Sequence, residues 1–238
     1  MPSSIRALRR CFRYQTLALV PFLAATAGVV SGQSSSGVAD NDPFPVGSGV
    51  IEVDFRGTPL NLHFYKPANY GGERFILLFH GASRAAAGYR DGASGMADRF
   101  ESLVVVPEFD QERFPNRTYQ FGGIFREDGS FADADEWTYA YVPELIEYIR
   151  RREGDPGLPH LILGFSAGGQ FVSRMAAFLD TEAERIVVIS PGSCIFPTRD
   201  LRFGLGFGGL PDAYGSDERI QRFLAQPITI YIGTNDTE

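Results

Sequence analysis

Residues 161–175 read LILGFSAGGQFVSRM. The apolar run 161–163 is short and uniform, which favours a buried strand over a lone amphipathic helix. Small and apolar residues then recur at helical spacing, namely at Gly168, Phe171, Val172, Met175 and Leu179. Between the two lies a G-x-S-x-G pattern, in which Gly164 and Gly168 leave room for a sharp strand-to-helix turn. The stretch therefore predicts a strained, exposed Ser166 that can act as a nucleophile.

Other apolar runs predict the rest of a sheet around this strand. Two alternating segments, residues 50–55 and 60–65, indicate an opening antiparallel hairpin. Buried strands are predicted at 75–79 (FILLF), 103–106 (LVVV), 186–189 (IVVI) and 228–232 (ITIYI). A second helical pattern has Pro143 near its first turn and comprises Val142, Leu145, Ile146 and Ile149. The alternation predicts an α/β fold, a mostly parallel sheet with helices on both faces.

A glycine turn follows the strand predicted at residues 75–79, where the chain reads His80-Gly81-Ala82-Ser83. Such a turn can aim backbone N–H groups at a developing oxyanion, and the amide of Ala82 would pair there with that of Ala167. The alternative is an ordinary glycine turn without a catalytic role.

A carboxylate follows the last predicted strand, in the sequence Gly233-Thr234-Asn235-Asp236. An acid at the end of a late strand, after the serine, matches the chain order serine, acid, histidine. Asp236 would then orient a histidine and stabilise its cation. It could also be a turn aspartate beside Asn235.

Together, GFSAGG (164–169), FHGAS (79–83) and IGTND (232–236) resemble the α/β-hydrolase superfamily, nearest to secreted esterases of the polyhydroxyalkanoate-depolymerase and feruloyl-esterase kind. The resemblance implies ester hydrolysis through an acyl-enzyme. We expect no metal or organic cofactor, because the sequence has no H-E-x-x-H motif, no cysteine pair and no dinucleotide fingerprint. The implied machinery comprises the catalytic residues Ser166 and Asp236, the oxyanion-hole residues Ala82 and Ala167, and the supporting residues His80, Gly81, Gly164 and Gly168.

The histidine pattern departs from that family, which places its catalytic histidine after the acid. The chain has three histidines, His63, His80 and His160, and all precede Ser166. His80 is the only rival for the base, because His160 lies some 20 Å from Ser166 across one strand length. We expect the base, with a C-terminal strand and helix, to be missing from these residues. Alternatives are an inactive hydrolase-fold fragment or binding protein, and a serine peptidase of the same fold.

Two long irregular stretches, residues 109–136 and 191–217, follow strands at the edge where Ser166 emerges. Their aromatic side chains would wall a pocket for a small or polymeric ester, with Tyr119, Phe121 and Phe196 as substrate contacts. Equally, both stretches could be packed loops with no role in ligand binding.

The N-terminus has the pattern of an export signal. Residues 1–13 are basic, 16–30 are apolar, and Arg9-Arg10 resembles a twin-arginine motif. We expect a signal peptide over 1–32, a flexible linker over 33–48 and a hydrolase domain over 49–238, secreted or periplasmic and without a stable membrane anchor after cleavage. The net charge of −7 argues against nucleic-acid binding. Cys194 would be the lone cysteine after cleavage. The oligomeric state stays open.

Overall fold

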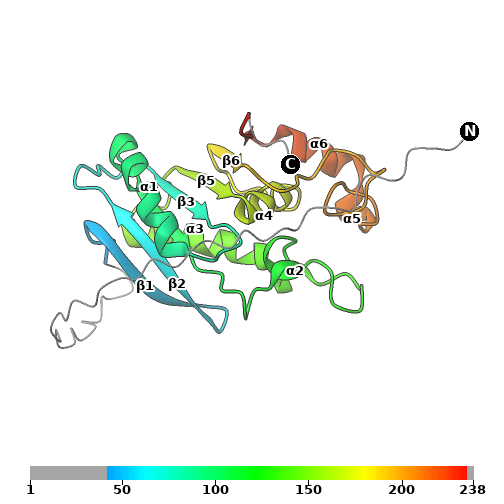
Figure 1. The fold of residues 1–238 in the computed structure, drawn as a ribbon, viewed down its shortest axis with the longest axis horizontal. Helices are drawn as coiled ribbons and strands as arrows, with labels where there is room; N and C mark the ends of the chain where they lie inside the picture. Colours follow the sequence, from blue (N-terminus) through cyan, green and yellow to red (C-terminus); the bar gives the residue numbers. More distant parts are fainter. Residues whose placement is uncertain (1–41, 235–238) are drawn as a thin grey trace, which may run out of the picture. The chain divides into compact units, whose positions relative to one another are not determined.

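The computed structural model describes residues 42–234 of the 238-residue chain. These residues contain a seven-stranded mixed sheet (Figure 1). It opens with an antiparallel hairpin of β1 (Gly47–Phe55) and β2 (Thr58–Lys66). Arg56 and Gly57 form the two-residue turn with φ values of 60° and 78°, the left-handed pair that suits a tight hairpin. The predicted hairpin is confirmed.

The other five strands are parallel. In chain order they are β3 (Phe75–Phe79), β4 (Leu103–Pro107), β5 (His160–Phe165), β6 (Arg185–Ile189) and β7 (Ile228–Tyr231). The order across the sheet is β1-β2-β4-β3-β5-β6-β7, with β2 antiparallel to β4. This confirms the predicted mostly parallel sheet. It also places the ends of β3 and β5 side by side, so the turns that follow them meet at one edge.

Helices cover both faces of the sheet. The longer ones are α1 (Ala86–Phe100), α3 (Tyr141–Glu153), α4 (Ala167–Met175) and α6 (Asp217–Ala225), and the short ones are α2 (Asn116–Tyr119), α5 (Asp212–Gly215), η1 (Ala134–Glu136) and η2 (Thr138–Ala140). The β3-α1-β4 and β5-α4-β6 crossovers run in opposite directions across the sheet, so right-handed connections put α1 and α4 on opposite faces. No helix within residues 42–234 is long and apolar enough to span a membrane.

Helix α3 confirms the second predicted helical pattern, because its four apolar positions are all buried, namely Val142, Leu145, Ile146 and Ile149. Pro143 is its third residue, where a missing N–H costs nothing. Helix α1 was not predicted. Its buried positions are Ala86, Ala93 and Ala97, and such small residues leave little hydrophobic periodicity to detect.

The prediction of a flexible linker over residues 33–48 is wrong at the C-terminal end of that range. Phe44 is buried, with its ring centroid 5.1 Å from that of Phe64, and its amide donates to Glu153. Strand β1 already begins at Gly47. One buried aromatic ring anchors an otherwise polar stretch, which composition alone does not indicate. Residues 1–41, with the predicted signal peptide, lie outside the described residues.

Strand β7 was predicted to be buried, but its second half is exposed. Ile230 is 49% exposed and Tyr231 64%, because β7 pairs only with β6 among the residues described. On the face that carries α1, the helix covers β2, β3 and β4. The neighbouring ends of β5 and β6 border an open, apolar groove of about 530 Å³, with Phe165 and Ile189 in its lining.

His160 gives the fold a predictable response to acid. It is buried against Phe75, with ring centroids 5.2 Å apart and nearly parallel, and neither ring nitrogen has a hydrogen-bond partner among residues 42–234. Burial lowers the pKa of His160 to about 4, below its ordinary value of 6.5. The folded state therefore holds His160 neutral, and protons bind the unfolded state first.

We expect the free energy of unfolding to fall as the pH drops from about 6.5 to about 4, with His160 contributing about 3 kcal/mol of that loss. His160→Phe keeps an aromatic ring beside Phe75 and removes the titrating group, so its urea midpoint should change less over this interval. Part of the pH dependence should remain in both proteins, because burial also lowers the pKa of His80 to about 4. Equal slopes for the variant and the wild type would contradict this assignment.

Candidate active site

Ser166 occupies the turn between β5 and α4. Its φ of 53° and ψ of −114° lie outside the regions that side-chain-bearing residues ordinarily adopt, at a cost of about 1 to 3 kcal/mol. Two backbone hydrogen bonds hold the turn, from Ser166 N–H to Ile189 O at 2.9 Å and from Gln170 N–H to Ser166 O at 3.0 Å. The side chain is half-buried. The predicted strained turn is present, with the hydroxyl-bearing residue at its apex.

The two glycines that flank Ser166 are needed for space. A Cβ on Gly164 would lie 2.2 Å from the carbonyl oxygen of Gly168, and a Cβ on Gly168 would lie 2.1 Å from the carbonyl oxygen of Phe79. Both neighbours are backbone atoms, which cannot swing aside. The end of β3 therefore presses directly on the start of α4, and this packing brings the turn after β3 to Ser166.

The turn after β3 spans residues 80–84 and is called the oxyanion turn below, after the role predicted for Ala82. The N–H of Arg84 donates to Gly81 O at 3.1 Å and closes it. A Cβ on Gly81 would lie 3.5 Å from the Cβ of Ser166, so the turn lies next to the serine. The amides of Ala82 and Ala167 donate to no acceptor within residues 42–234. The arrangement leaves two N–H donors free on the turns beside a hydroxyl.

Tyr89 also belongs to this site, and the sequence reasoning missed it. Its hydroxyl oxygen would lie only 2.3 Å from a Cβ on Gly81, and its ring centroid is 6.1 Å from that of Phe165. Gly81 is thus pinched between Tyr89 and Ser166. Because Tyr89 sits in α1, whose sequence pattern is weak, nothing in the sequence placed it here.

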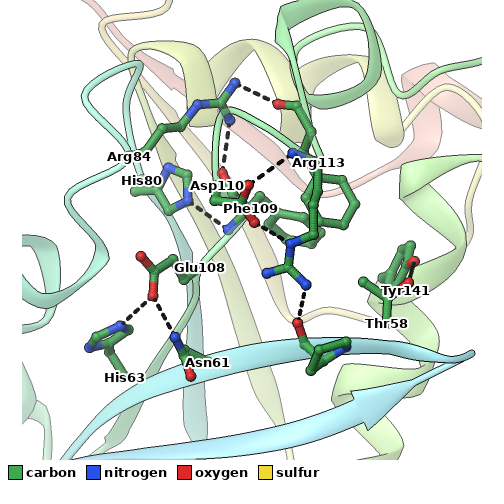
Figure 2. A network of polar contacts seen from close by, with 12 residues as sticks. Thr58, Asn61, His63, His80, Arg84, Glu108, Phe109, Asp110, Arg113 and Tyr141 are labelled. Carbon is green, nitrogen blue, oxygen red and sulfur yellow. Dashed lines mark hydrogen bonds and ion pairs between the residues drawn. The ribbon is translucent and has the colours of Figure 1, made fainter.

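His80 supports the turn and is not available as a base. Its Nε2 accepts from the N–H of Phe109 at 3.1 Å, which Figure 2 shows as a dashed line, and its Nδ1 donates to Gly81 O at 3.0 Å. The side chain is fully buried, and burial lowers its pKa to about 4. Both nitrogens of the neutral ring are therefore occupied.

The other two histidines lie far from Ser166. His63 is on β2, separated from β5 by β4 and β3, which at about 4.8 Å per strand puts it roughly 14 Å away. It contacts Glu108 at 3.0 Å, and Asn61 donates to the same carboxylate oxygen (Figure 2). His160 begins β5, at the opposite edge of the sheet from Ser166. None of the three histidines in the printed sequence reaches Ser166.

The acid predicted at Asp236 lies outside the described residues. Strand β7 ends at Tyr231 and is parallel to β5 and β6, so the chain leaves it at the edge of the sheet that carries Ser166. The role of Asp236 stays a prediction.

The two segments predicted to wall the substrate pocket are joined by Arg174 of α4. Its Nη1 donates to Gln120 O at 2.9 Å in the first segment, and its Nε donates to Gly204 O at 3.0 Å in the second. The guanidinium carbon lies 4.3 Å from the centroid of Phe121. Burial lowers the pKa of Arg174. The two carbonyl oxygens accept hydrogen bonds from its buried guanidinium. Both segments are thus fixed to α4, the helix that follows Ser166.

The three residues predicted to contact substrate differ in burial. Tyr119 is fully buried, and its hydroxyl donates to His80 O at 2.7 Å, so it supports the oxyanion turn and its predicted substrate contact is wrong. An aromatic residue in a segment without a clear sequence pattern can pack in the core as well as line a pocket. Phe121 is half-buried against Arg174, and Phe196 is 53% exposed. Both remain candidates.

Cys194 is half-buried and packs against the core. It has no disulfide partner among residues 42–234, and burial raises the pKa of its thiol.

No protein-family model matches the chain, and no curated protein sequence matches it. Solved structures do. Poly(aspartic acid) hydrolase-1 from Sphingomonas sp. KT-1 is 30% identical, with a TM-score of 0.74 over 82% of this chain and 74% of that one. A poly(3-hydroxybutyrate) depolymerase from Bordetella parapertussis is also 30% identical, with a TM-score of 0.75 over 84% of this chain and 72% of that one.

A more distant structure shares the fold alone. Esterase 2 from Thermogutta terrifontis, solved after phosphoramylation by tabun, is 17% identical, with a TM-score of 0.50 over 79% of this chain and 72% of that one.

Proposed function

The chain belongs to the α/β-hydrolase superfamily, as a hydrolase of the esterase type, and on that basis we propose that it cleaves carboxylic esters through an acyl-enzyme on Ser166. The observation that carries the proposal is the backbone of Ser166, held at φ 53° between β5 and α4 and next to the turn at Gly81. Strain of this kind persists where surrounding structure enforces it, and it gathers at functional sites.

In the proposed reaction, Ser166 Oγ attacks the ester carbonyl carbon while a base takes its proton. The amides of Ala82 and Ala167 donate to the oxyanion, and the N-terminus of α4 adds a favourable field. The alcohol leaves with the proton returned by the base, and water then releases the acid from Ser166. We assign the orienting carboxylate to Asp236.

The base cannot be assigned to His63, His80 or His160, for the reasons of distance and hydrogen bonding given above. We therefore propose a histidine that follows residue 238 in the full chain. Experiments on this proposal need the full chain as encoded by its gene.

Hydrolysis of an amide is the second candidate. One of the two structural relatives at 30% identity is a poly(aspartic acid) hydrolase, and poly(aspartic acid) is a polyamide. The same serine, oxyanion donors and base would serve for either bond, since both reactions pass through a tetrahedral oxyanion. Substrate comparison is therefore the experiment that separates the two.

We expect the full chain to release about one equivalent of p-nitrophenol from p-nitrophenyl butyrate in a burst, followed by steady turnover. An alanine p-nitroanilide and an oligomer of aspartic acid should react much more slowly than the ester and than an oligomer of 3-hydroxybutyrate. Faster cleavage of the amides would favour the second candidate. Failure of a folded full chain to cleave any of the four would indicate a hydrolase-fold binding protein or inactive remnant.

A further inference from the structure

The oxyanion turn ends at a buried cation, Arg84. The residue is 9% exposed, and its guanidinium carbon lies 4.1 Å from the centroid of the Tyr119 ring. The guanidinium donates to four acceptors, which are Gln111 Oε1 at 3.1 Å, Phe109 O at 3.3 Å, Phe114 O at 2.9 Å and Asn116 Oδ1 at 3.4 Å. None is a carboxylate, and all belong to residues 109–119, which we call the clamp segment.

The clamp segment also holds the backbone at the other end of the turn. Tyr119 donates to His80 O at 2.7 Å, and Phe109 N–H donates to His80 Nε2 at 3.1 Å. His80 in turn donates to Gly81 O. The oxyanion turn is therefore tied to one segment at both ends, through His80 and through Arg84, with Ala82 between them.

Arg84 itself has a φ of 58°, a left-handed conformation that a residue with a long side chain adopts only when its surroundings impose it. The contacts of the side chain supply that constraint, because a guanidinium presents its donors in a rigid plane. Stability alone is a weak reason for such a group, since buried charges are often replaced by apolar residues without loss.

We propose that Arg84 is the positioning residue of the oxyanion turn, which it locks against the clamp segment so that the amide of Ala82 stays aimed at the oxyanion on Ser166. The inference rests on the proposed function and deepens it. Arg84 acts through the turn and contacts no substrate atom. Its loss should weaken the binding of the transition state and leave the binding of substrate nearly unchanged.

The test uses Arg84→Lys in the full chain, because lysine keeps the charge and loses the planar fork. We expect kcat for p-nitrophenyl butyrate to fall by about 10- to 100-fold with KM within about threefold, since removal of one oxyanion donor costs about 10²- to 10³-fold. The affinity for a trifluoromethyl ketone, which forms a tetrahedral adduct, should fall by the same factor as kcat/KM.

Arg113→Lys is the matched control. Arg113 also lies in the clamp segment, but it pairs with Asp110 and the Pro59 carbonyl and does not touch the oxyanion turn (Figure 2). We expect it to retain the kinetic constants and analogue affinity of the wild type. Hydrogen exchange gives a readout independent of turnover, because Arg84→Lys should speed exchange in residues 80–84 and leave the strand 185–189 protected.

Two variants distinguish a failure of the proposed function from a failure of the role assigned to Arg84. Ester turnover that survives Ser166→Ala would overturn the proposed function. If Ser166→Ala is inactive and folded Arg84→Lys keeps the kcat, analogue affinity and exchange rates of the wild type, the role of Arg84 is wrong. Should Arg84→Lys fail to fold, Gln111→Ala, which removes the acceptor of Nε alone, must lower kcat and analogue affinity in proportion, and wild-type values would contradict the inference.

Discussion

Replacing Ser166 by alanine should lower kcat for p-nitrophenyl butyrate by at least about 10⁴-fold, because the acyl-enzyme cannot form and only the oxyanion donors remain. The change removes one oxygen from a half-buried side chain, and the hydrogen bonds that hold its backbone to Ile189 and Gln170 stay in place. We therefore expect the unfolding temperature to stay close to that of the wild type. Steady-state kinetics on the full chain, with thermal unfolding in parallel, measures both.

Ser94→Ala is the control for this loss. Ser94 lies on α1, where its hydroxyl donates to the Asp91 carbonyl, and it takes no part in the site. Its kcat should equal that of the wild type within about twofold. A Ser166→Ala variant with kcat within tenfold of the wild type would show that another group performs the chemistry.

Gly168→Ala should destabilise the fold and damage the site together. The new Cβ would meet Phe79 O at 2.1 Å and His80 O at 2.7 Å, so β3 and α4 must move apart. We expect a loss of about 3 kcal/mol in the free energy of unfolding. Displacement of the oxyanion turn from Ser166 should lower kcat as well, by about 10²-fold or more. Urea unfolding and ester kinetics check the two effects.

Gly95→Ala is the control, and we expect it to raise the free energy of unfolding where Gly168→Ala lowers it. Gly95 is also inside a helix, but an added Cβ there meets nothing within 4 Å. Alanine should stabilise that helix by about 0.5 to 1 kcal/mol, because it restricts the unfolded chain. Equal effects at both positions would mean that the close contact of β3 with α4 does not constrain the site.

The sequence predicted the features that depend on short stretches of chain. Five parallel strands, the hairpin, α3 and the turn at Ser166 each have a local pattern, and the structure has all of them. The α/β-hydrolase fold follows from their order. Residue-level burial was less predictable, since the exposure of Tyr231 depends on where β7 lies in the sheet.

Features that depend on contacts between distant segments were missed. Arg84 acts on residues about 25 to 32 positions away, and Arg174 joins segments 54 residues before it and 30 after it. Neither arginine has a sequence pattern that distinguishes it from a surface charge. Tyr119 was wrongly predicted to contact substrate for the same reason, because its burial depends on the distant residues His80 and Arg84.

The central claim is that Ser166 is the nucleophile, and covalent labelling tests it most directly. The full chain is treated with a fluorophosphonate, and the adduct is located by mass spectrometry of peptides. We expect one adduct, on the peptide containing Ser166, which is absent in Ser166→Ala and unchanged in Ser94→Ala. Undiminished labelling of Ser166→Ala, or an adduct on another residue such as Ser83, would contradict the account.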